Sequence, residues 1–197
     1  MAGPWTVGSA DFTLETAPPD AVVRTELLPA PFTGNGLLLE GTNRSDDLLL
    51  YASQAIAGLP ASTDFLAAID VEIVTDTPTG CAGVGGSPGE SVWIVSMASA
   101  TEPAVVDFQG MRRLNLERGN QSQPGNSSDV PGTIASSNTD CATRKAPESK
   151  WLLPTRSIPV RSDVDGRVWI TLGMDSGFEA KSRVWIRSAT VRLRPAR

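Results

Sequence analysis

The sequence predicts an all-β protein, an antiparallel β-sandwich of about ten strands that forms one domain over residues 1–197. Three observations lead to this prediction. Short segments with alternating apolar and polar residues recur along the chain, and the 18 glycines and 15 prolines mark frequent turns between them. No internal repeat or low-complexity linker divides the 197 residues, a length that fits one domain.

The alternation is clearest where Ile69, Val71 and Ile73 are separated by Asp70 and Glu72. Because successive side chains of a strand point to opposite faces, this pattern places one set in the core and the other in water. Similar patterns predict strands near 11–16, 21–28, 36–42, 47–53, 66–75, 90–98, 104–108, 111–117, 150–161, 166–174 and 183–194.

Two of these segments also fit a helix. Asp46 and Asp47 precede the apolar run 48–56, and Gly58 follows it, as at the start and end of a helix. Apolar residues in 66–75 also fit helical spacing. We expect strands in both places, with a strand that runs into one helical turn as the alternative for the first.

The last predicted strand changes phase. Val184 and Ile186 share one parity, whereas Ala189 and Val191 have the other. A β-bulge near residues 187–188 would keep the apolar side chains on one face. Two separate strands are the alternative.

Residues 118–149 form the longest stretch without a strand pattern, and they are rich in Ser, Asn, Gly and Pro. A loop of this length in a compact domain is usually functional or mobile. We expect a long loop here.

Composition excludes several classes of function. The chain has no histidine, which rules out Ser-His-Asp triads, Cys-His pairs and His-ligated metals. Its net charge of −5 does not favour nucleic acid or an anionic membrane as a partner. No apolar run approaches the ~20 residues that a transmembrane helix needs.

Two segments resemble a dinucleotide-binding loop and a calcium-binding loop, but neither matches the full motif. The glycine-rich segment 81–90 precedes the strand-like run 91–95, whereas a dinucleotide loop needs a helix there, so we interpret it as a structural loop. Residues 163–166 resemble the start of an EF-hand, but its twelfth position is Met174. We expect a tight hairpin turn at Asp165-Gly166.

Hard oxygen ligands leave a different calcium site open. Asp46, Asp47 and Glu90 lie at the starts of predicted strands, where loops of a sandwich meet. We therefore name them as candidate calcium ligands.

Tryptophan and carboxylate side chains together suit a sugar site, because an aromatic ring stacks on the apolar face of a sugar. Trp169, Trp185, Asp175 and Glu179 are the candidate ligand-binding residues. They also fit a purely structural role, in which both tryptophans lie in the core and both acids are exposed in a turn.

An enzyme is the alternative, because paired carboxylates hydrolyse glycosides without histidine. Asp175 or Glu179 would act with Asp46 or Asp47 in a hydrolase or lyase.

Cys81 and Cys141 are the only cysteines, so they allow one disulfide of unambiguous connectivity. Both lie in Gly-, Ser- and Thr-rich surroundings that do not favour buried apolar thiols. We expect a bridge, with two free buried thiols as the alternative. Persistent disulfides belong mainly to oxidising compartments.

Four segments together resemble an uncharacterised family of bacterial proteins whose members look exported or lipid-anchored: Asn43 to Leu48, Cys81 to Val92, Gly119 to Gln121, and Trp169 to Glu179. The resemblance implies no catalytic residue. Residues 184–191 also look like the last strands of galactose-binding-like jelly rolls.

The sequence thus favours a non-catalytic binding module of the cell envelope or exterior, with carbohydrate or another envelope protein as its partner. The alternatives are the carboxylate-based enzyme and a structural or assembly protein. Met1-Ala2-Gly3-Pro4 lacks the features of a signal peptide, so the protein is either cytosolic or begins after an excised signal. From the expected disulfide and the family resemblance we expect a periplasmic or extracellular protein whose signal or anchor lies outside this chain.

Overall fold

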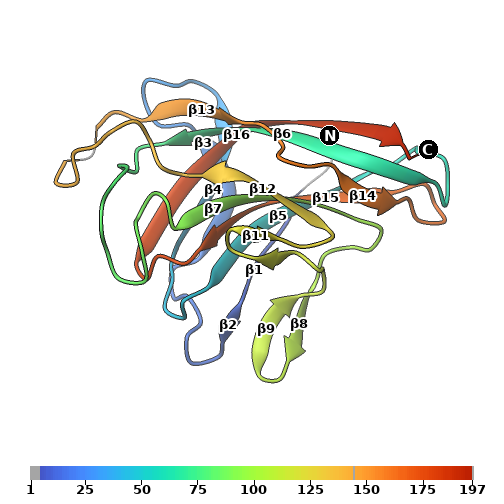
Figure 1. The fold of residues 1–197 in the computed structure, drawn as a ribbon, viewed down its shortest axis with the longest axis horizontal. Helices are drawn as coiled ribbons and strands as arrows, with labels where there is room; N and C mark the ends of the chain where they lie inside the picture. The colour runs from blue at the N-terminus through green and yellow to red at the C-terminus, as the bar shows by residue number, and fades with distance from the viewer. Residues whose placement is uncertain (1–4, 144, 197) are drawn as a thin grey trace.

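The computed structural model describes residues 5–143 and 145–196, and all regular elements in these ranges are β-strands. Two antiparallel sheets stack face to face, which confirms the predicted β-sandwich (Figure 1). Sheet I has the strand order β1 (Thr6–Ala10), β5 (Leu48–Ile56), β15 (Val168–Ser176), β7 (Val92–Ser99) and β12 (Ser128–Thr133).

Sheet II has the order β13 (Glu148–Leu152), β6 (Asp64–Thr75), β16 (Lys181–Pro195), β4 (Asn35–Thr42) and β3 (Val22–Leu27). A further strand, β14 (Ile158–Arg161), pairs with the first part of β6, while β13 pairs with its last part. Strand β6 therefore pairs with two shorter strands in succession along one of its edges.

The main core lies between the two sheets. On β15, Ile170 and Met174 are fully buried, and on β6, Ile69 and Ile73 are too. These are the inward sets that the alternation predicts, and both ambiguous segments, 48–56 and 66–75, are strands.

Strand β16 contains the predicted bulge. Its register against β6 shifts between Ile186 and Ser188, so Val184 and Ile186 before the shift and the partly buried Ala189 and Val191 after it all pack on the main core. The extra residue is what allows a change of parity without a change of face.

A second, smaller hydrophobic core lies on the outer face of sheet I. There Leu49, Tyr51, Val95 and Met97 pack with Leu114. The cover is a three-stranded sheet of β2 (Phe12–Thr13), β9 (Met111–Leu114) and β8 (Val105–Phe108), whose β8–β9 hairpin projects from the sandwich (Figure 1). A short hairpin of β10 (Gly119–Asn120) and β11 (Gln123–Pro124) lies in the segment predicted as loop.

Three predictions of local structure are corrected. The stretch 118–149 contains the edge strand β12, which alternation misses because Pro131 and Gly132 lie in it at a bulge. The segment 150–161 is not one strand but two, β13 and β14. The turn at 163–166 connects β14 of sheet II with β15 of sheet I, so it links the sheets rather than forming a hairpin.

Among the described residues, no helix is long and apolar enough to cross a membrane.

Candidate functional site

The four segments of the sequence resemblance meet at one end of the sandwich, which we call the motif end. It consists of residues 43–48, 81–90, 117–121 and 175–179. Asn43 Nδ2 donates to the Ser176 carbonyl at 2.7 Å, and the Glu179 amide donates to the Val84 carbonyl at 2.9 Å. The motifs, distant in sequence, therefore belong to one place in the fold.

A buried arginine lies at the centre of the motif end. The Arg118 side chain is 6% exposed and donates to Asp11 and, from its other amino group, to Asp175 Oδ2. Asp47 Oδ2 lies 3.5 Å from the same guanidinium. The Gln121 amide donates to Asp175 Oδ2 at 2.8 Å. One cation thus faces three carboxyl groups.

The backbone delivers these groups from four separate elements. Asp175 is near the end of β15 and fully buried, and Asp47 immediately precedes β5. Asp11 occupies the corner between β1 and β2 with φ 69°, in the left-handed region that non-glycine residues seldom adopt. Arg118 comes from the segment before β10. The cluster therefore fastens that segment to sheet I.

The pKa of Asp47 is raised to about 9. Burial is the largest cause, and the neighbouring Asp175 carboxylate and a hydrogen bond to it add to the shift. Burial also raises the pKa of Asp11, although Arg118 opposes this. Burial alone would lower the pKa of Arg118, but Asp175 and Asp11 raise it above its ordinary value. At neutral pH, the Asp47 carboxyl group consequently carries a proton.

A second carboxyl pair is exposed at the same end. A hydrogen bond with Asp46 raises the pKa of Glu179, and Gln121 Nε2 donates to the Asp46 carbonyl at 2.9 Å. The candidate residues Asp46 and Glu179 therefore lie beside each other at the motif end.

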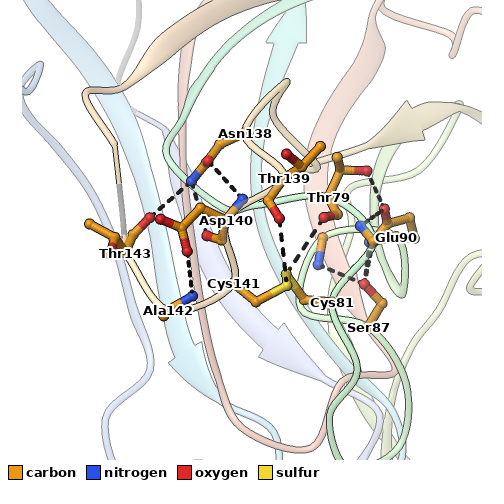
Figure 2. Close-up of a disulfide and its surroundings, with 12 residues drawn as sticks. Thr79, Cys81, Ser87, Glu90, Asn138, Thr139, Asp140, Cys141, Ala142 and Thr143 are labelled. Atoms are coloured by element: carbon orange, nitrogen blue, oxygen red, sulfur yellow. Dashed lines mark hydrogen bonds between the residues drawn. A yellow bond between two sulfur atoms is a disulfide. The ribbon is translucent and has the colours of Figure 1, made fainter.

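The third predicted calcium ligand, Glu90, serves the glycine-rich loop. Its carboxylate accepts hydrogen bonds from the Ser87 and Thr79 hydroxyls (Figure 2). It also accepts one from the Gly80 amide at 2.7 Å. Burial alone would raise the pKa of Glu90, but the hydrogen bonds from Ser87 and Thr79 hold it at about 2.

The structure therefore does not assemble Asp46, Asp47 and Glu90 into one site. Within 5–143 and 145–196, no group of three or more acidic or cysteine side chains is arranged to hold a metal ion. The reason lies in the chain's own contacts, because Asp47 faces Arg118 and Glu90 faces loop hydroxyls.

The predicted disulfide is present. Cys81 and Cys141 are joined with a Cα–Cα distance of 5.6 Å. The bridge ties residues 138–143 to the start of the glycine-rich loop (Figure 2). Hydrogen bonds within that segment, such as Asn138 Nδ2 to the Thr143 carbonyl at 3.0 Å, fix its shape.

The four candidate ligand-binding residues do not come together. Trp169 and Asp175 lie on one strand six residues apart, which is about 20 Å. Trp185 belongs to sheet II and is only 5% exposed. Its indole N–H donates to Glu26 at 3.0 Å, and Arg183 lies over its ring at 4.7 Å. Trp185 is thus a structural residue.

Sequence reasoning did not single out the most exposed tryptophan. Trp151 is 54% exposed on the edge strand β13, where it pairs with Glu72 of β6. Glu72 pairs in turn with Ser188 of β16, and Ser188 Oγ donates to it at 2.9 Å. Next along the strands, Arg192 forms a two-pronged ion pair with Asp70. We call this outer surface of sheet II the Trp151 face.

Comparisons with known proteins give structural neighbours only. No protein-family model matches the chain, and no curated protein does, so the family resemblance stays an expectation. A solved structure of carbohydrate-binding modules from the β-sandwich superfamily shares 10% identity with a TM-score of 0.43 over 98% of this chain.

The enzymatically active domain of bacteriophage CBA120 tailspike protein 4 matches 96% of this chain with 12% identity and a TM-score of 0.39. A carbohydrate-binding module in complex with β-1,4-galactotriose matches 98% with 12% identity and a TM-score of 0.37, over 90% of its own length. This chain spans 58% of the first structure and 19% of the second. The fold assignment rests on the sheet pairing itself.

Proposed function

We propose that the protein is a non-catalytic carbohydrate-binding module that holds a glycan on the Trp151 face. One observation carries the proposal: Trp151 is a large aromatic side chain that remains 54% exposed on a strand. A sugar ring has an apolar face that an exposed indole on a rigid strand can cover.

The surroundings of Trp151 support the same chemistry. The exposed side chains of Ser188, Thr190 and Arg192 follow one another on the same face of β16. They supply hydroxyl and guanidinium groups that can hydrogen-bond sugar hydroxyls. The β-sheet holds ring and polar groups in fixed positions, which lowers the entropy cost of binding.

The disulfide supports an oxidising location for this module, in the periplasm or outside the cell. Carbohydrates of the cell surface or surroundings would be available to it there.

Affinity electrophoresis tests the proposal. Wild-type protein should be retarded in native gels that contain at least one of a panel of soluble polysaccharides. Trp151→Ala should weaken that retardation at least tenfold, because truncating an aromatic hot-spot residue costs about 2 kcal/mol or more. Phe108→Ala is the matched control, since Phe108 is an equally exposed aromatic on the β8–β9 hairpin. Equal retardation of the Trp151 variant and wild type, or no retardation by any polysaccharide, would overturn the proposal.

A further inference from the structure

A cavity of about 410 Å³ opens at the motif end beside the disulfide. Its volume is in the range of small-ligand sites. Residues from four segments line it: Thr77, Pro78, Pro88, Cys141, Ala142, Phe178, Ala180, Lys181 and Ser182. The bridge from Cys81 holds the wall that Cys141 and Ala142 form.

Phe178 gives the cavity a fixed aromatic wall. A Cβ atom built on Gly83 would lie 2.3 Å from Cε2 of the Phe178 ring, so a side chain at this position would have to displace the ring. The ring also packs against the main core. Glycine on one side and the core beneath hold the ring in place, and Pro78 and Pro88 add rigid apolar surface.

Thr77 adds a hydroxyl group to the cavity lining. The residue is 6% exposed, its amide donates to Thr75 Oγ1 at 3.2 Å, and its carbonyl accepts from the Ser136 amide at 2.7 Å. These backbone hydrogen bonds hold the residue in place, so its hydroxyl is offered to a ligand from a fixed position.

The charge of the cavity favours a neutral ligand. Lys181 Nζ lies 2.8 Å from Glu40 Oε1 and 3.4 Å from Asp20 Oδ2, so carboxylates already neutralise this ammonium group. Ser182 Oγ is 3.3 Å from Ser176 Oγ. The lining therefore offers hydroxyl groups and apolar surface but no unpaired cation for an anionic ligand.

We propose that this cavity binds one neutral hydroxylated ring of pyranose size, with the ring's apolar face against Phe178 and a hydroxyl bonded to Thr77. The site goes beyond the proposed function, because it lies apart from the Trp151 face: Thr77 follows Glu72 by five residues, about 16 Å along the strand direction. It would accept a single sugar residue, whereas the open Trp151 face would accept a chain.

NMR titration of the ¹⁵N-labelled protein tests the proposal. The probes are the methyl glycosides of glucose, galactose, mannose and N-acetylglucosamine. At least one should shift the amide signals of Thr77, Ala142 and Phe178 in a saturable manner. Thr77→Val should weaken this binding about fivefold or more, because it removes one hydrogen bond from a buried site. Thr33→Val, at an exposed threonine, should bind like the wild type.

A second variant distinguishes a loss of binding from a folding defect in Thr77→Val. Ala142 is exposed at the cavity wall, so Ala142→Leu should fold normally and obstruct binding. Trp151→Ala should leave this titration unchanged. The proposal is overturned if no glycoside shifts the cavity amides, or if both cavity variants bind like the wild type. Shifts confined to the Trp151 face would overturn the cavity site and leave the proposed function intact.

Discussion

Replacing Cys81 with Ala and Cys141 with Ser removes the bridge between the glycine-rich loop and the segment 138–143. The two cysteines are 60 residues apart in sequence. Closing a loop of this length restricts the unfolded chain, and the chain-entropy relation gives a stabilisation of about 4 kcal/mol at 25 °C. Alanine suits the buried Cys81, and serine suits the exposed Cys141. The double variant also avoids a free thiol.

Urea denaturation of the oxidised wild type and the double variant measures this difference. The free energy of unfolding should fall by about 4 kcal/mol, and the slope m should rise because the unbridged unfolded chain exposes more surface. Wild type treated with a reductant should unfold like the variant. A loss below about 1 kcal/mol, or a reduced wild type as stable as the oxidised one, would refute the reasoning.

Three further outcomes follow from the motif end. Arg118→Met leaves buried carboxylates without their cation and should cost about 3–5 kcal/mol in urea denaturation; a loss under 1 kcal/mol would contradict the structural role of this arginine. The pKa of Asp47 is raised from 3.8 to about 9, so its contribution to stability is complete below about pH 4 and is lost as the pH rises towards 9. Asp47→Asn cannot lose a proton, and its melting temperature should therefore fall less than that of wild type between pH 5 and pH 9. An equal fall in both proteins would argue against the raised pKa of Asp47. Gly83→Ala forces a methyl group into the Phe178 ring and should cost about 1–3 kcal/mol by chemical denaturation, and wild-type stability would show that the ring can move away.

Alternation made the central strands predictable because their inner faces are buried. Ile69, Val71 and Ile73 are inside as expected, and the change of parity in β16 correctly indicated a bulge. Edge strands were harder, since β1 contributes few apolar side chains to either core. Its Gly8 instead leaves room for the Tyr51 side chain, a tertiary contact that no local pattern reveals.

The site was predictable only in part. Asp47 and Asp175 were named as candidate residues, and both face Arg118. Arg118 itself was not named, although it directly precedes the Gly119–Gln121 motif, because its burial depends on contacts far along the chain. The burial of Trp185 depends on residues far along the chain, because Leu28 and Phe32 cover it. The residues next to Trp185 in the sequence therefore do not reveal that its side chain is buried.

The five tryptophan indole N–H signals in a ¹H–¹⁵N spectrum test the central claim most directly. The polysaccharide that retards the protein in gels can be cut to an oligosaccharide and titrated into the labelled protein. Carbohydrate binding on the Trp151 face predicts that the Trp151 signal shifts in a saturable manner. The signal of Trp185, whose indole N–H is bonded to Glu26, should stay in place. A saturable titration that leaves the Trp151 signal unmoved would contradict the account.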